Sequence, residues 1–227
     1  MLIVALGLAI ICIPKGELHL LLCDHHTPAR DIFFRYYTRI AEYLPYTICA
    51  LILLSGKVGN GAMATACVAG ADLSTQILKH IINAPRPVTW FAANMPEVQL
   101  PLVEGVRMNY WFSFPSGHTT SFFALAFVLS ILATSRLTEK QSNSVSGPTA
   151  QRSNNVSGPT ALAVQLLLFV AAALGGYSRI YLCQHFAADV MAGIGVGLTL
   201  TGIIYAVFTH FQGQKWYNYR LFSKKVR

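Results

Sequence analysis

The chain has 227 residues, of which 54% are hydrophobic and only 11% are charged. A soluble domain carries roughly a quarter charged residues, so this composition excludes an ordinary soluble fold and indicates one polytopic membrane domain over residues 1–227. The net charge is +8, but the basic residues do not alternate with aromatic ones, which argues against a nucleic-acid partner. Many of them gather at the C-terminus, and the positive-inside rule then predicts a cytoplasmic tail.

The N-terminal part predicts an all-α arrangement with three spans and one surface helix. The first apolar segment, 2–22, is interrupted at Pro14 and is short for a span, which needs about 20 residues. In 29–40, charged residues alternate with apolar ones at helical spacing, so we expect an amphipathic helix at the membrane interface. Segments 43–54 and 62–83 are the second and third predicted spans, joined by a glycine-rich turn.

The third predicted span carries a polar face in its second half. Asp72, Gln76, Lys79 and Asn83 follow one another at spacings of four, three and four residues, which places them on one side of a helix. Ionisable groups inside a span are costly and usually face a functional interior. For Asp72 we favour the simpler interpretation, in which it pairs with a polar group of a neighbouring helix.

The C-terminal part predicts three more spans, which makes about six in all. They cover 116–134, 161–181 and 186–211, and an aromatic-rich loop that suits the membrane boundary occupies 88–113. The composition of residues 138–160, rich in Ser, Asn, Gly and Pro, predicts a flexible cytoplasmic loop without a catalytic role. This loop contains a short duplication, because 142–150 is nearly repeated eleven residues later in 153–161.

The cysteines and the isolated histidines give no metal or disulfide signal. The five cysteines are scattered and form no Cys-x-x-Cys pair, so we interpret them as small buried residues. Histidines such as His19 and His80 stand alone. The sequence therefore predicts no metal site and no cofactor.

Three short motifs are expected to meet at one membrane face, because the third and fifth spans end where the fourth and sixth begin. The first is Lys79, six residues, then Arg86-Pro87; the second is Pro115-Ser116-Gly117-His118; the third is Ser178-Arg179, five residues, His185, three residues, Asp189. Each motif alone has an ordinary structural explanation, such as a helix cap or a snorkelling cation. Their joint occurrence at alternating hairpin ends indicates a functional site.

Together the motifs resemble the signature of the type 2 phosphatidic acid phosphatase (PAP2) superfamily, in its integral-membrane lipid phosphatase branch. Every signature position is present between Lys79 and Asp189, so the resemblance places the catalytic core in the last four predicted spans. It implies a phosphohistidine at His185, a general acid at His118, and metal-independent hydrolysis of a phosphoric monoester by water.

The residue types also suit phosphoryl transfer on their own chemistry. The reaction spreads negative charge over the phosphate oxygens, so fixed cations and amide donors are the main catalytic need. The candidate phosphate-binding residues are Lys79, Arg86, Ser116, Gly117 and Arg179, of which three are cations and two lie at a helix N-terminus.

The two histidines are expected to divide the proton and phosphoryl chemistry. We expect Asp189, one helical turn from His185, to hold one ring nitrogen and leave the other facing phosphorus. His118, on a different helix, can then protonate the departing oxygen.

The expected substrate is a membrane lipid that carries a phosphate monoester or a pyrophosphate. Lipid A is slightly favoured over undecaprenyl pyrophosphate, phosphatidylglycerol phosphate and phosphatidic acid, on general likeness to small bacterial members of the family. No obligatory protein partner is evident. The expected location is the bacterial inner membrane, with both termini inside and the active site facing the periplasm.

Two alternatives remain open at the level of the sequence. A lipid phosphotransferase would use the same site but pass the phosphoryl group to a second lipid, without releasing free phosphate. A non-enzymatic anion channel or transporter would use the basic cluster only for binding, and would show conduction or uptake without turnover.

Overall fold

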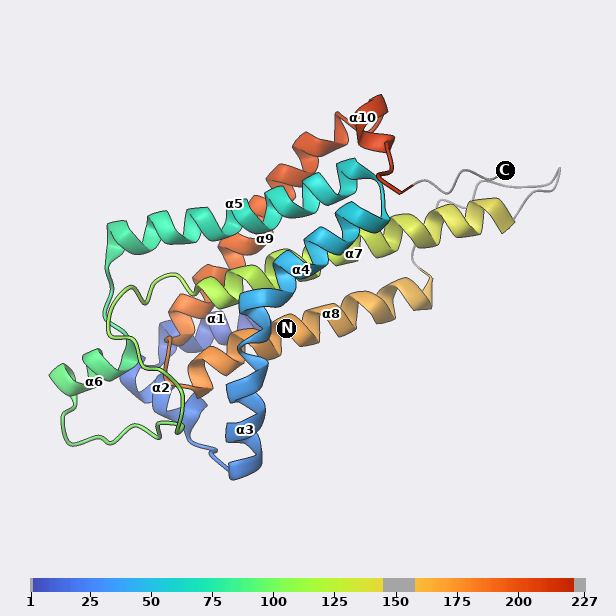
Figure 1. The fold of residues 1–227 in the computed structure, drawn as a ribbon. Helices are drawn as coiled ribbons and strands as arrows, with labels where there is room; N and C mark the ends of the chain where they lie inside the picture. Colours follow the sequence, from blue (N-terminus) through green and yellow to red (C-terminus); the bar gives the residue numbers. More distant parts are fainter. Residues whose placement is uncertain (1, 145–157, 223–227) are drawn as a thin grey trace.

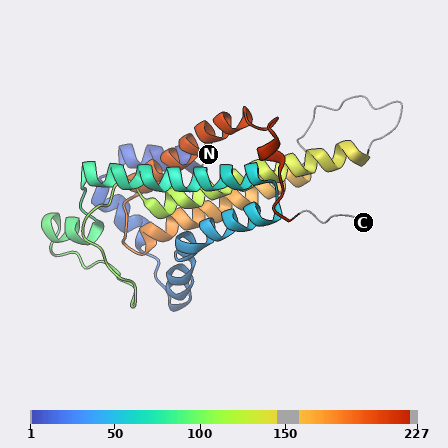
Figure 2. The same ribbon diagram turned by 45° about the horizontal axis from the view of Figure 1, so that its top comes forward.

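The computed structural model describes the backbone of residues 2–144 and 158–222, and every regular element in these ranges is a helix. Five long helices lie side by side (Figure 1 and Figure 2). They are α4 (Ile40–Ser55), α5 (Val58–Ile82), α7 (Gly117–Ser144), α8 (Pro159–Tyr181) and α9 (Ala187–Thr209). The predicted all-α class is confirmed for the described part of the chain.

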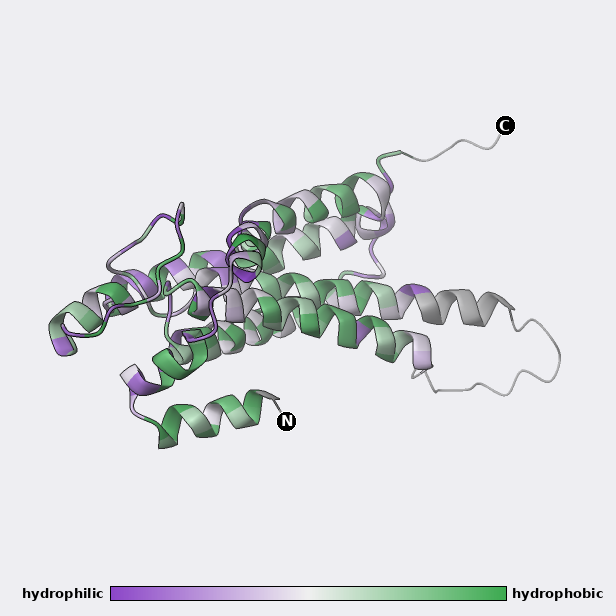
Figure 3. Cartoon of the chain, turned by 90° about the horizontal axis from the view of Figure 1, so that it is seen from below, coloured by the Kyte–Doolittle hydropathy of each residue, from purple (hydrophilic) through white to green (hydrophobic). Residues whose placement is uncertain are grey.

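Three of these helices are long and apolar enough to cross a membrane, namely residues 117–136 of α7, all of α8 and all of α9. Their outer faces expose large apolar side chains, as Leu162, Leu166 and Leu167 do on α8. Figure 3 shows hydrophobic residues along much of the bundle. By length and composition, the chain is therefore a polytopic membrane protein.

The first predicted span is not a single helix. Residues 2–22 form α1 (Leu2–Cys12) and α2 (Lys15–Cys23), which meet at Pro14. Proline lacks the N–H that would continue the hydrogen-bond ladder, so the helix is interrupted there. At 1.5 Å per residue the two helices are only about 17 Å and 14 Å long, so neither crosses a bilayer core of about 30 Å alone.

The next predicted helix is present. Helix α3 (Pro28–Tyr37) coincides with the predicted amphipathic segment, and Thr27 caps it by accepting from the backbone N–H of Arg30. Ile32 and Tyr36 are exposed on it, whereas Phe34 is buried. Its place at a membrane interface stays a prediction.

Two predicted loops contain helix. Residues 88–113 include α6 (Pro87–Asn94), which starts with proline at a position where no N–H is needed. Helix α7 continues to Ser144, into the predicted loop 138–160, and α8 already begins at Pro159. The remaining part of the duplicated segment, 145–157, lies outside the described residues. A short helix, α10 (Lys215–Asn218), follows α9.

Helices α7 and α9 approach closely because α9 has glycines on the side facing α7. A Cβ at Gly193 would lie 2.6 Å from the backbone oxygen of Ser116, and a Cβ at Gly197 would lie 2.7 Å from that of Thr120. Small residues allow this backbone contact between helices in lipid. The contact fixes the first turn of α7 against α9.

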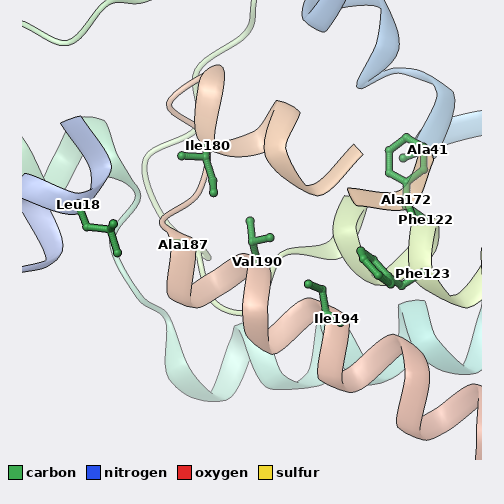
Figure 4. Packing of buried hydrophobic residues seen from close by; sticks show 9 residues of the cluster. All are labelled: Leu18, Ala41, Phe122, Phe123, Ala172, Ile180, Ala187, Val190 and Ile194. Carbon is green, nitrogen blue, oxygen red and sulfur yellow. The ribbon is translucent and has the colours of Figure 1, made fainter. Parts of the chain in front are cut away.

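An apolar cluster beside this contact holds α8 on the same pair of helices. This buried cluster includes Ile180 of α8, Val190 and Ile194 of α9, and Phe122 and Phe123 of α7 (Figure 4). The cluster lies in the half of the bundle where α8 ends and α9 begins, so it keeps these two helix ends together.

The polar residues predicted on one face of α5 have different environments. Asp72 accepts hydrogen bonds from Ser121 on α7, at 2.6 Å, and from the hydroxyl of Tyr46 on α4. The expected helix-packing role of Asp72 is therefore confirmed. Lys79 is buried nearer the end of the helix, whereas Gln76 and Asn83 are exposed, so they do not share its buried environment.

Candidate active site

All eight predicted site residues lie at one end of the bundle, where α5 and α8 end and α6, α7 and α9 begin (Figure 1). The last turn of α5 carries Lys79, and the last turn of α8 carries Arg179. Arg86 directly precedes α6, and Ser116, Gly117 and His118 form the start of α7. The connection from α8 to α9 carries His185, and the first turn of α9 carries Asp189.

The pair of His185 and Asp189 differs from the expected helical pair. Helix α9 begins after His185, so the histidine stands in the preceding connection. Its Nδ1 lies 3.6 Å from Oδ2 of Asp189, longer than a hydrogen bond. Asp189 instead caps α9, because the same oxygen accepts from the backbone N–H of Phe186 at 2.9 Å.

Ser113 connects the two residues. Its hydroxyl donates to Oδ2 of Asp189 at 2.5 Å, and its oxygen lies 3.4 Å from Nδ1 of His185. Because that hydroxyl has one proton, Nδ1 of His185 must carry the hydrogen for any bond to Ser113. The chain of contacts from His185 through Ser113 to Asp189 then favours the tautomer with an unprotonated Nε2.

The environment of His185 keeps its ring neutral. Burial, together with the positive charges of Arg86, Arg179 and Lys79, lowers the pKa of His185 well below its ordinary value. A neutral imidazole keeps an electron pair on one ring nitrogen, as a nucleophile requires.

Gln184 holds the two arginines together. Its Oε1 accepts from Arg86 Nη1 at 3.0 Å and lies 3.5 Å from Arg179 Nη2. Arg86 also donates from Nε to the backbone oxygen of Trp111, and Arg179 donates to Oγ1 of Thr38 at 2.6 Å. Both guanidinium groups are buried, and no carboxylate among the described side chains forms a salt bridge with either of them, which suits an anionic ligand.

The start of α7 lies against Lys79. The Nζ of Lys79 donates to the backbone oxygen of Phe112. A Cβ built at Gly117 would lie 4.0 Å from this Nζ. The hydroxyl oxygen of Ser116 accepts from Thr119 at 2.8 Å, so its own proton remains available to a ligand. The backbone N–H of Ser116 is not available, because it donates to the backbone oxygen of Asp189.

His118 stands at the more open side of the cluster. Its side chain is 27% exposed, and its Nε2 lies 3.4 Å from a carboxylate oxygen of Glu42 at the start of α4. Through this contact the carboxylate of Glu42 can orient the imidazole of His118.

Four residues of this arrangement lie outside the three sequence motifs. Glu42, Ser113 and Gln184 contact the histidines and arginines, and Thr38 binds Arg179. Gln184 directly precedes His185 and Ser113 lies two residues before Pro115, but nothing in their spacing distinguishes them. Thr38 and Glu42 come from a distant part of the sequence and are brought in by the packing of α3 and α4.

The comparison with protein families identifies the class. Residues 60–212, more than half of the chain, match the PAP2 superfamily. The protein therefore belongs to this superfamily, as the three motifs had indicated. A search of curated proteins found no significant match.

Two solved structures have a similar fold. Aquifex aeolicus LpxE has a TM-score of 0.60 at 22% sequence identity, and the match covers 84% of this chain and 93% of that one. The first transmembrane PAP2-type phosphatidylglycerolphosphate phosphatase from Bacillus subtilis has a TM-score of 0.65 at 18% identity, covering 94% and 96%. At these identities the likeness establishes the fold.

Proposed function

We propose that this protein is a membrane lipid phosphatase that hydrolyses a phosphate monoester or pyrophosphate through a phosphohistidine intermediate. The observation that carries the proposal is the set of buried cations, Lys79, Arg86 and Arg179, around a neutral and buried His185. Three fixed positive charges compensate a bound phosphate and the charge that develops during transfer. Membership of the PAP2 superfamily supports the same reaction.

The proposed reaction has two displacements at phosphorus. Nε2 of His185 attacks, and the bond between phosphorus and the lipid oxygen breaks while His118 gives that oxygen a proton. Water then attacks the phosphohistidine, with His118 taking a proton from it, and His185 is regenerated. Lys79, Arg86, Arg179, the Ser116 hydroxyl and the Gly117 amide bind the phosphate oxygens.

The substrate would reach this site from the bilayer. The site lies at one end of helices with exposed apolar faces, so a lipid can keep its chains in the membrane while its phosphate meets the cations. Lipid A remains slightly favoured. The similar fold of a phosphatidylglycerolphosphate phosphatase keeps phosphatidylglycerol phosphate a strong alternative, beside undecaprenyl pyrophosphate and phosphatidic acid.

The proposed orientation places the site on the periplasmic side of a bacterial inner membrane. In this arrangement α4 and α5 would cross the bilayer beside the three long apolar helices α7, α8 and α9, with the short apolar α1 packed against α9 as a sixth helix. The opposite end of the bundle carries Lys57, Arg136 and Arg220 around one cavity, which is the cytoplasmic pattern under the positive-inside rule.

The experiment is phosphate release by the full-length protein in detergent, measured over a panel of these four lipid phosphates. We expect release from at least one lipid and a loss of about a thousandfold or more in His185→Ala. His80→Ala is the matched control, since His80 is an exposed histidine outside the cluster. Full activity in His185→Ala would exclude the nucleophile assignment, and transfer to a second lipid without free phosphate would indicate a phosphotransferase.

A further inference from the structure

A second cluster of chemically competent side chains lies close to His185. His19 and Cys23 are one turn apart on α2, and Cys183 lies in the connection from α8 to α9. One donor atom of each residue, the ring nitrogen or the sulfur, lies within 4.8 Å of the other two. All three side chains are buried, with exposed fractions of 1% or less.

Within the described part of the chain, the imidazole of His19 has no hydrogen-bond partner on either ring nitrogen. Its neighbours are aromatic rings, with the centroid of Phe186 at 5.1 Å and that of Phe91 at 5.6 Å. A buried polar group without a hydrogen-bond partner is unfavourable, so the ring nitrogens of His19 are available to bind a ligand.

The two thiols are in direct contact. Their side chains share a hydrogen bond, and the two sulfur atoms lie within 4.8 Å of each other. Cys183 has a left-handed backbone conformation, with φ of 51°, which is uncommon for a residue with a side chain. Both sulfur atoms and one ring nitrogen of His19 lie within the same small volume.

We propose that His19, Cys23 and Cys183 bind a zinc ion. Two cysteines and one histidine are an established donor set for zinc, and three protein ligands leave one tetrahedral position for water or another small donor. Binding converts two thiols to thiolates and releases two protons, so the ion and its ligands are neutral together. Neutrality matters here because an isolated charge in this buried place would be strongly unfavourable.

The zinc ion would be structural rather than catalytic. None of its ligands belongs to the groups proposed to touch phosphate, but Cys183 precedes His185 by two residues. The ion would therefore tie α2 to the connection that carries His185. A contact on the same side already exists, since Lys15 Nζ lies 3.8 Å from the ring centroid of Phe186.

A disulfide between Cys23 and Cys183 is the competing outcome. It would satisfy the two sulfur atoms but would leave both nitrogens of His19 buried and unpaired. The unpartnered ring of His19 is the reason that zinc is favoured.

The first test uses the unchanged protein, so it does not depend on any variant folding. The full-length chain is produced with added zinc, purified through a tag that binds no metal, dialysed, and analysed by elemental mass spectrometry and zinc X-ray absorption. We expect about one zinc ion per chain, with two sulfur ligands at about 2.3 Å and one nitrogen at about 2.0–2.1 Å. Zinc-free protein, a sulfur-free coordination shell, or a Cys23–Cys183 disulfide in non-reduced peptide maps would overturn the proposal.

The second test assigns the ligands. Cys23→Ser and Cys183→Ser should each reduce bound zinc at least about tenfold after the same dialysis, since each removes one thiolate ligand. Cys49→Ser is the matched control, because Cys49 is equally buried but belongs to a separate cluster with Cys67 and Met63. Unchanged zinc in both ligand variants, or an equal loss in the control, would contradict the assignment. The readout is metal content, so failure of the proposed phosphatase activity would leave it interpretable.

Discussion

At the scale of single residues, the proposed catalytic pair depends on a serine between its members. Asp189 does not reach Nδ1 of His185 within hydrogen-bond distance, whereas Ser113 contacts both. The carboxylate is held by the helix cap of α9 and by Ser113, so its position is fixed independently of the histidine. Ser113 therefore sets the tautomer and orientation of His185.

Ser113→Ala is expected to lower kcat by about tenfold to a hundredfold, because hydrogen bonds to charged groups contribute about 1.5–3 kcal/mol. The measurement is phosphate release against substrate concentration, with KM largely unchanged since Ser113 touches no proposed phosphate ligand. Ser113→Thr, which keeps the hydroxyl, is the control and should recover part of the rate. An unaltered kcat in Ser113→Ala would exclude this positioning role.

Gly117→Ala tests whether phosphate approaches the backbone at the start of α7. A Cβ at this position meets only ordinary contacts, at 3.6 Å from Thr75 and 3.9 Å from Lys79, so the fold should tolerate it. We expect an unchanged melting temperature and a loss of about tenfold or more in kcat/KM, equivalent to about 1.4 kcal/mol. Full kcat/KM in this variant would show that phosphate does not approach Gly117.

At the scale of helices, glycine positions decide how closely α7 and α9 pack. Gly193 and Gly197 are one turn apart on α9 and face backbone oxygens of α7, whereas Gly195 has nothing within 4 Å. The sequence shows a row of glycines but does not indicate which of them face a neighbouring helix. That information comes only from the rotation of α9 in the bundle.

Gly193→Ala should lower stability by about 1–3 kcal/mol, because its Cβ would overlap the backbone at Ser116 and force α7 away. The same displacement should lower turnover, since Ser116 and His118 move with α7. Thermal unfolding in detergent and phosphate release are the two measurements. Gly195→Ala is the control and should match the parent in both; equal destabilisation by the two changes would contradict the packing argument.

At the scale of the whole molecule, the site and the two helix ends that flank the duplicated segment lie at opposite ends of the bundle. The segment joins the end of α7 to the start of α8, whereas the site lies where α7 begins and α8 ends (Figure 1). Deleting residues 145–155 leaves one uninterrupted copy of the repeated unit. Because loop length affects stability only weakly, we expect turnover within about twofold of the parent. Phosphate release by the purified deletion variant checks this, and a severe loss with intact folding would assign the duplication a catalytic role.

The sequence alone determined the helical class, most of the long helices and the residues that gather at one end. Hydrophobic runs and motif spacing are local properties, so they predict helices such as α8 and α9 within a few residues. The sequence also determined the family, because each of the three motifs lies within one short stretch of the chain. Pro14 was visible as an interruption, but the sequence did not reveal that it separates two helices that are each too short to cross the bilayer.

Only the tertiary structure decided which side chains support the motif residues. Thr38 reaches Arg179 and Glu42 reaches His118 because α3 and α4 pack beside α7 and α8, across large separations in sequence. The same kind of contact brings Cys183 to His19 and Cys23, which the sequence showed only as scattered residues. Spacing along a chain fixes neighbours on one helix, whereas partners on different helices depend on how those helices are rotated and packed.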